Sequence, residues 1–330
     1  MELKRVIIGG PRPDQTWRGI PGIERSPGGR LFVSWFSGGE REPDEPNRVY
    51  LQISDDDGQT FGEPIVLADP PGASRAFDPC VWLDPRGRLW YIYNVSNREE
   101  GQHGVWVRIC AEPDAAEPQW SEPRRLGFNV AFCFRINKPT VLSTGEWLMP
   151  VTWARDGAKE WFAGASQVHG CAMSRDEGAT WSLHGEVHTP PWGLENMFIE
   201  RKDGVVVMYM RCDAGTIWRS MSTDRGRTWS QGSPTTIINP GTQFFVCKLA
   251  SRRWLLINSP DPTARTGIVA MLSEDEGKTW GPPLMLDERT DVSYPDACQA
   301  ADGTIYAVHD RERHGAMEIL LSVFNEGDLG

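Results

Sequence analysis

Short apolar runs, each led by a turn, recur along the whole chain. Each run is five to seven residues long and alternates or is continuously apolar, and five of the six begin at a glycine. Runs of this length bounded by glycine are typical of β-strands, and no segment has the 3.6-residue periodicity of a long helix. The runs span residues 29–35, 87–93, 145–151, 204–210, 253–257 and 303–308.

The spacing of these runs predicts the architecture. Their starts lie 49 to 59 residues apart, so six units account for all 330 residues. A unit of this size that contains several short strands fits one blade of a β-propeller. A β-helix would need a much shorter repeat, and a pair of β-sandwiches gives no reason for a period along the whole chain. We therefore predict an all-β, six-bladed β-propeller with four antiparallel strands per blade, forming a single domain over residues 1–330.

A second repeat is an octapeptide with the pattern Ser-x-Asp-x-Gly-x-Thr-Trp, in which one copy ends in Phe. Its chemistry is that of a turn, because Ser and Asp can accept bonds from nearby backbone N–H groups, Gly adopts positive φ, and the aromatic residue anchors the returning strand. We interpret it as a structural turn. The copies span residues 54–61, 174–181, 222–229 and 273–280, and a worn copy at 111–120 keeps only the final Trp.

Charge and composition limit the partners. The 34 basic and 45 acidic side chains give a net charge of −11, which disfavours nucleic acid and anionic membranes but leaves room for a small anion in a local basic pocket. The first residues lack the features of a signal peptide, so we expect a cytoplasmic protein unless a leader was removed. The seven cysteines and six histidines lack metal-ligand spacing, so we expect reduced thiols and neither a metal nor an organic cofactor.

The octapeptide resembles the Asp-box of the sialidase (neuraminidase) superfamily. Four good copies in a chain of six units make the resemblance specific for the fold, and it implies a propeller with Asp-box turns at the outer rim. It is less specific for function, because receptors and other non-catalytic propellers carry related boxes.

The same resemblance implies three arginines that bind the carboxylate of a sialic acid. Guanidinium groups keep their charge and bind carboxylates in a bidentate manner. The family's Arg-Ile-Pro corresponds to Arg18-Gly19-Ile20-Pro21, with one glycine inserted. The second and third arginines correspond to Arg211, at the end of an apolar run, and Arg265, before the last box.

The resemblance also implies the residues that would do the chemistry. Tyr294 corresponds to the nucleophile, since a neutral phenol avoids repulsion by the substrate carboxylate, and Glu195 to the base that activates it. Asp44 corresponds to the general acid and base, with Glu42 and Glu45 as alternatives for the same role.

Other cationic side chains lie near these positions in the sequence. Lys138 and Arg135 are further candidates for contacts with substrate. Arg311 and Arg313 are expected to form ion pairs at the rim.

The implied activity is that of a retaining exo-glycosidase, which releases terminal sialic acid or a related 2-keto-3-deoxy acid sugar through a covalent tyrosine intermediate. The expected partner is a glycan or small molecule that carries a carboxylate. Two alternatives stay open. The same mechanism could act on another ulosonic acid, or the propeller could bind a glycan or a protein without catalysis.

Overall fold

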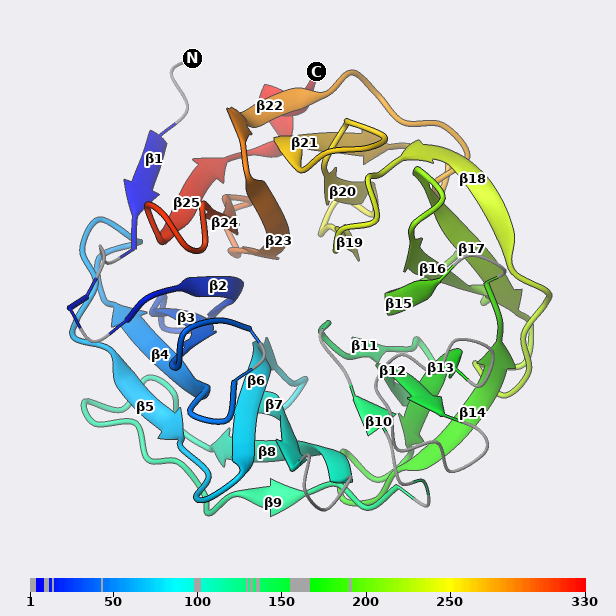
Figure 1. The fold of residues 1–330 in the computed structure, drawn as a ribbon. Coiled ribbons are helices and arrows are strands. Elements are labelled where there is room, and N and C mark those ends of the chain that lie inside the picture. The colour runs from blue at the N-terminus through cyan, green and yellow to red at the C-terminus, as the bar shows by residue number, and fades with distance from the viewer. Residues whose placement is uncertain are drawn as a thin grey trace.

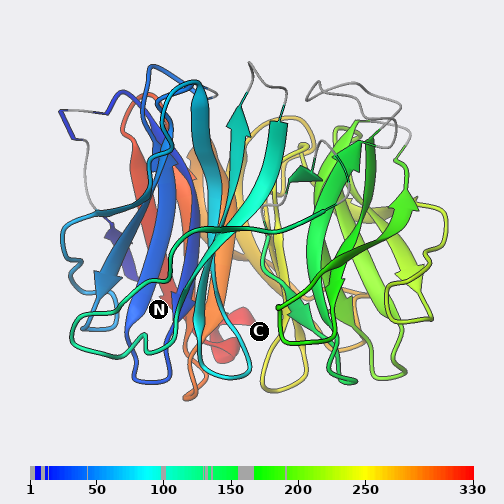
Figure 2. The same cartoon turned by 90° about the horizontal axis from the view of Figure 1, so that it is seen from below.

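Six antiparallel sheets form a ring around a central axis in the computed structural model of the chain (Figure 1). The structure describes residues 4–8, 12–13, 15–42, 44–97, 102–128, 130, 133–134, 137–154, 167–189 and 192–330. The strands run between the two faces of the ring (Figure 2). The predicted six-bladed β-propeller is confirmed.

Each blade presents its first strand to the axis and its fourth strand to the rim. Blade 1 contains β2 (Arg18–Arg25), β3 (Leu31–Ser37), β4 (Arg48–Ser54) and β5 (Ile65–Ala68). Blade 2 contains β6 (Ser74–Leu83), β7 (Leu89–Asn97), β8 (Gln102–Cys110) and β9 (Arg124–Arg125). Blade 3 contains β10 (Cys133–Phe134), β11 (Thr140–Val141), β12 (Trp147–Ala154), β13 (Gln167–Ser174) and β14 (Ser182–Val187).

The remaining blades follow the same plan. Blade 4 contains β15 (Gly193–Glu200), β16 (Val206–Cys212), β17 (Thr216–Ser222) and β18 (Ser233–Ile238). Blade 5 contains β19 (Phe245–Lys248), β20 (Trp254–Asn258), β21 (Thr266–Ser273) and β22 (Leu284–Thr290). Blade 6 contains β23 (Val292–Gln299), β24 (Ile305–Arg311), β25 (Glu318–Phe324) and β1 (Lys4–Ile7), and a short 3₁₀ helix, η2 (Glu326–Leu329), follows β25.

The six apolar runs in the sequence form the second strand of each blade. These strands are β3, β7, β12, β16, β20 and β24. They are apolar on both faces because each blade packs between two neighbours, so that β12 and β16 are buried along their whole length. Strands covered on both sides are near-continuous hydrophobic runs.

Two blades depart from the simple repeat. In blade 3 two short strands, β10 and β11, both pair with β12 and share the innermost place. In blade 6 the outermost strand is β1, which pairs with β25 from Lys4↔Val323 to Ile7↔Leu320. The start of the chain therefore closes the ring.

The Asp-box turns join the third and fourth strands of blades 1, 3, 4 and 5. In the first box, Ser54 Oγ accepts from Gly58 N at 2.9 Å and Asp56 Oδ1 accepts from Thr60 N at 2.8 Å. Gly58 has φ of 77°, and a Cβ there would overlap the side chain of Leu321 in blade 6. The turn therefore needs glycine both for its conformation and because it packs against the preceding blade.

The part of the chain that the structure describes contains no helix with the length and apolarity needed to cross a membrane.

Candidate active site

The first strands of four blades share a β-bulge at the same place near the axis. The pairing register shifts in β2, β6, β15 and β23, and one residue of each bulge has positive φ: Ile20 at 58°, Asp78 at 47°, Glu195 at 54° and Tyr294 at 55°. A bulge re-aims a side chain, and strained backbone of this kind gathers at functional sites. The bulges set the directions of Glu195 and Tyr294.

Tyr294, Glu195 and Arg211 form one buried hydrogen-bonded group. The Tyr294 hydroxyl donates to Glu195 Oε1 at 2.8 Å. Arg211 Nη1 donates to the same carboxylate oxygen at 2.5 Å and to the tyrosine oxygen at 2.7 Å. All three residues are at most 7% exposed. Blades 4 and 6 thus bring a phenol, a carboxylate and a guanidinium together from distant parts of the sequence.

The electrostatics keep the phenol protonated. Burial raises the pKa of Tyr294, and the charge of Glu195 raises it further, whereas Arg211, Arg265 and Arg313 act in the opposite direction. The hydroxyl therefore carries a proton at neutral pH and donates it to Glu195. Three positive charges beside it would stabilise a negative charge that develops on the phenol oxygen.

Arg265 lies beside the same tyrosine. It is half-buried, its Cζ is 5.5 Å from the centre of the Tyr294 ring, and its Nη1 is 3.4 Å from Ser293 Oγ. Arg211 Cζ is 5.8 Å from the same ring centre. These two predicted arginines therefore flank Tyr294.

Arg18 points elsewhere. Its Nη2 donates to Gln15 Oε1 at 2.9 Å, and its Cζ lies 5.2 Å from the ring centre of Trp35. Trp35 belongs to the apolar core that blades 1 and 6 share. The inserted Gly19 explains the difference from the expectation, since neighbouring residues of a strand point to opposite faces.

Arg313 was expected at the rim, and this expectation is wrong. The residue follows β24, and its Cζ lies 4.4 Å from the centre of the Tyr294 ring. It does form ion pairs, with Asp310 Oδ2 at 2.8 Å and Glu42 Oε2 at 3.1 Å, but at the axis, where its side chain is only 15% exposed. Sequence reasoning missed this position because only the fold brings the end of β24 next to β23.

The three acidic candidates for the general acid have different surroundings. Asp44 Oδ2 accepts from the backbone N–H groups of Glu40 and Arg41, at 2.7 and 3.2 Å, and so holds its own loop. Glu42 contacts Arg313 at the axis, and Glu45 is exposed. Of the three, Glu42 contacts Arg313, which lies over the Tyr294 ring, and Asp44 anchors the loop that carries Glu42.

Lys138 lies inside the axis and not at an open surface. Its Nζ donates to the Ala297 carbonyl at 2.8 Å and lies 3.3 Å from Asp296 and 3.5 Å from Glu24. The ammonium group of Lys138 is therefore paired inside the protein. This differs from the expectation that Lys138 contacts the substrate. Arg135 lies outside the described residues.

Asp78 is a candidate that the sequence reasoning did not single out. It has the bulge position in blade 2 that Glu195 and Tyr294 have in blades 4 and 6, and it is 3% exposed. The signal was in the sequence, because Pro79 follows it, as prolines follow Ile20 and Tyr294. Proline inside a strand marks a bulge or an edge.

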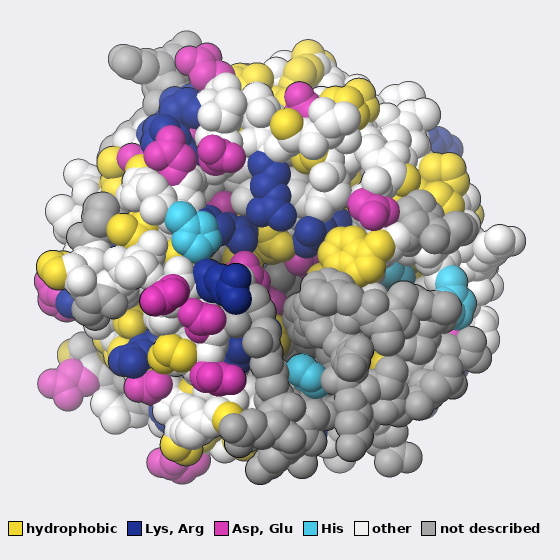
Figure 3. Space-filling view, viewed as in Figure 1, with side chains coloured by type: hydrophobic (Ala, Val, Ile, Leu, Met, Phe, Trp, Pro, Cys, Tyr) yellow, Lys and Arg dark blue, Asp and Glu magenta, His cyan; other side chains and the backbone are white. Residues whose placement is uncertain are grey.

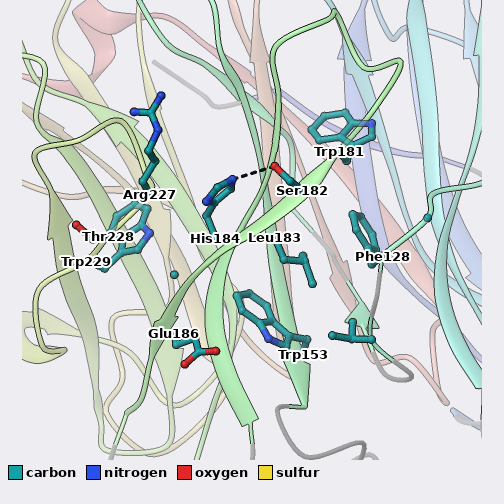
Figure 4. Close-up of a pocket in the computed structure, with 13 residues that line it drawn as sticks. Phe128, Trp153, Trp181, Ser182, Leu183, His184, Glu186, Arg227, Thr228 and Trp229 are labelled. Carbon is teal, nitrogen blue, oxygen red and sulfur yellow. Dashed lines mark hydrogen bonds between the residues drawn. The ribbon is translucent and has the colours of Figure 1, made fainter.

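Positive side chains gather around the hollow at the centre of the face shown in Figure 3. A separate cavity of about 750 Å³ lies between blades 3 and 4, away from Tyr294 (Figure 4). It is lined by the indole rings of Trp153, Trp181 and Trp229, and His184 Nε2 is 2.9 Å from Ser182 Oγ at its edge. No residue of the tyrosine group lines it.

Comparisons with known proteins agree with this architecture. Residues 29–307 match the family model described as a BNR repeat-like domain. A curated protein of Bacteroides fragilis named sialidase is 21% identical over an alignment of length 286, which covers 74% of this chain and 51% of that protein. The chain thus spans about half the length of this curated relative.

Solved structures with the same fold include two that are named for sialidase activity. The Hadza microbial sialidase Hz136 superposes with a TM-score of 0.80 at 19% identity, covering 96% of this chain and 67% of the other. The intramolecular trans-sialidase from Ruminococcus gnavus, solved in complex with oseltamivir carboxylate, superposes with a TM-score of 0.75 at 15% identity, covering 96% of both chains. At these identities the likeness concerns the fold.

Proposed function

We infer the function from one premise: this chain belongs to the BNR repeat-like domains of the sialidase superfamily. Relatives that are named sialidases indicate a glycosidase of the sialidase type. We propose that the chain is a retaining exo-glycosidase that releases a terminal sialic acid or a related 2-keto-3-deoxy acid sugar. The observation that supports this most directly is the buried contact of the Tyr294 hydroxyl with Glu195 and Arg211.

In the first step Tyr294 is the nucleophile. Its oxygen attacks the anomeric carbon while its proton passes to Glu195, and the bond from that carbon to the leaving oxygen breaks. Glu195 Oε1 already accepts from the hydroxyl, and Glu195 Oε2 is buried without a hydrogen-bond partner among the described residues. Arg211, at 2.7 Å from the phenol oxygen, stabilises the charge that forms there.

The leaving oxygen takes a proton from an acidic side chain of the loop before β4, either Asp44 or Glu42. The resulting carboxylate then accepts a proton from water, which attacks the anomeric carbon and displaces the tyrosine. Tyr294 recovers its proton from Glu195. Two inversions at one carbon give net retention.

Arg211 and Arg265 are proposed to hold the substrate carboxylate. Each guanidinium lies within 6 Å of the Tyr294 ring centre, so a carboxylate bound between them would place the anomeric carbon next to the phenol. A tyrosine suits this place, because an ionised Asp or Glu would meet the charge of the substrate. The proposed partner is a glycan or small molecule that ends in such an acid sugar.

Hydrolysis of aryl glycosides tests the proposal. The panel contains the aryl glycosides of sialic acid, its deaminated analogue and a shorter 2-keto-3-deoxy sugar, and NMR of the first product reports its anomeric form. We expect the α-anomer from an α-glycoside, and a loss of kcat of about 10³-fold or more in Tyr294→Phe. Tyr209→Phe, at a buried tyrosine elsewhere in blade 4, is the control and should keep its activity.

The outcomes separate the alternatives. Turnover of only the deaminated or the shorter sugar would keep the mechanism and change the substrate. Full turnover by Tyr294→Phe would overturn the nucleophile. Binding of the acid sugars without turnover of any glycoside would point to a non-catalytic glycan-binding propeller.

A further inference from the structure

We propose that Arg313 is a substrate-binding residue, which contacts the substrate carboxylate from the place that a side chain at position 19 would otherwise fill. This inference rests on the proposed function and deepens it. It replaces Arg18 in the predicted arginine triad with a residue from the opposite end of the chain.

Gly19 is the residue before the bulge in β2. A Cβ at this position would lie 2.8 Å from Arg313 Nε, 2.9 Å from Arg313 Cδ and 2.9 Å from Asp310 Oδ2, the oxygen that holds Arg313 Nε. Real Cβ atoms do not approach other atoms so closely, so the Arg313 side chain already occupies the space into which residue 19 points. Glycine at this position has no positive φ to explain it. Glycine is required here because Arg313 and the Asp310 carboxylate that pairs with it fill the space.

Neighbouring groups hold the Arg313 guanidinium in one orientation. Nε donates to Asp310 Oδ2 at 2.8 Å and Nη1 to Glu42 Oε2 at 3.1 Å. Asp310 is itself fixed, because its Oδ2 accepts from Ile20 N at 2.8 Å and its Oδ1 from Ser293 Oγ at 2.6 Å. A guanidinium held in this way binds a planar anion with little loss of side-chain entropy.

Arg313 also has donor capacity left toward Tyr294. Among the described residues, its Nη2 has only a long contact of 3.4 Å, to Ser293 Oγ. Of the arginines over the Tyr294 ring, Arg313 comes nearest to the ring centre, at 4.4 Å. Arg211, Arg265 and Arg313 therefore surround the phenol, and the charge of a substrate carboxylate would lie among them.

The first test compares an acid with its ester. The probes are 2,3-didehydro sialic acid and its methyl ester, whose binding is measured by calorimetry for the wild type, Arg313→Gln and Arg311→Gln. Arg311 lies two residues away and pairs with Glu318 at 3.0 Å, so it is the matched control. We expect the preference for the acid to fall at least about tenfold in Arg313→Gln and to stay unchanged in Arg311→Gln.

Turnover of the aryl sialoside adds a second readout. We expect kcat/KM to fall about 100-fold in Arg313→Gln. Arg313→Lys, which keeps the charge but loses the planar fork, should lie between the wild type and Arg313→Gln. An unchanged preference for the acid in folded Arg313→Gln would overturn the inference, whatever happens to kcat.

A double-mutant cycle tests the geometry at Gly19 itself. Gly19→Ala should displace Arg313 and lower kcat/KM in the wild-type background, but should have a much smaller effect in Arg313→Ala, where only the contact of the new methyl group with Asp310 Oδ2 remains. Equal losses in both backgrounds would overturn the inference. If the wild type cleaves none of the three acid-sugar glycosides and binds none of the corresponding acids, the proposed function fails and takes this inference with it. If the wild type cleaves one of them, the tests use that sugar, and a failure concerns Arg313 alone.

Discussion

Replacing Glu195 by Gln tests the role of this residue in catalysis and, separately, its contribution to stability. The change removes one negative charge and keeps the size of the side chain. Glu195 Oε1 accepts from both Tyr294 and Arg211, and its side chain is 2% exposed. The variant therefore loses the base that takes the proton of Tyr294 and leaves the buried charge of Arg211 without its opposite charge.

Both losses can be estimated. Removing a general base lowers kcat by about 10²- to 10⁴-fold. Removing one partner of a buried ion pair costs about 3–5 kcal/mol, and because Gln still offers an acceptor we expect about 2–4 kcal/mol. For a chain of 330 residues, that corresponds to a fall in Tm of about 3–6 °C.

The assay combines aryl sialoside kinetics with thermal unfolding. The control is Glu200→Gln, at the other end of the same strand, where the carboxylate accepts from Ser143 N and Ser143 Oγ, each at 2.8 Å. We expect this control to lose some stability and to keep its kcat. If the two variants lost kcat equally, or if Glu195→Gln kept more than a third of it, the role of Glu195 as a base would be refuted.

Three further predictions concern the acid, the pH dependence and the Asp-box turn. Glu42 and Asp44 are the two candidates for the acid. Glu42→Gln should slow substrates with poor leaving groups far more than activated aryl glycosides. The same pattern in Asp44→Asn alone would assign the role to Asp44. Burial lowers the pKa of His169 from 6.5 to about 3. The unfolded chain therefore takes up a proton there below pH 6.5 that the folded chain does not, and the free energy of unfolding should fall by about 2–3 kcal/mol by pH 4.5. Urea unfolding at several pH values should show that His169→Gln removes this part of the acid sensitivity; an unchanged pH dependence would exclude His169 as its source. Gly58→Ala should cost about 1–3 kcal/mol, because the residue has positive φ and a methyl group would overlap Leu321; a stability equal to that of the wild type in urea unfolding would contradict this packing.

The fold could be predicted because each blade repeats the same local pattern. The second strand of a blade is buried on both sides and follows a turn, so its sequence is an apolar run that usually begins at glycine. The Asp-box marks the turn between the third and fourth strands. The closure by β1 could not be predicted in this way. Lys4–Ile7 precedes the first repeat unit, and its partner is recognised only when the ring is complete.

The site was only partly accessible from the sequence. Tyr294, Glu195 and Arg211 are in contact, and their order along the chain was the reason to group them. The positions expected for Arg18, in the arginine triad, and for Arg313, at the rim, differ from the structure for a physical reason. One inserted residue turns a side chain to the other face of a strand, and the space left at Gly19 is filled by Arg313, which follows β24 and which no local pattern places there.

The pairing of β1 with β25 has a consequence during synthesis. Lys4–Ile7 is synthesised more than 300 residues before its partner strand, Glu318–Phe324, so β1 has no partner for about 15–60 s at ribosomal rates. During that time an unpaired strand and the open edge of each newest blade are available to other nascent chains. We expect the yield of refolded protein to fall with increasing protein concentration, and the last step of folding to be the capture of the first strand.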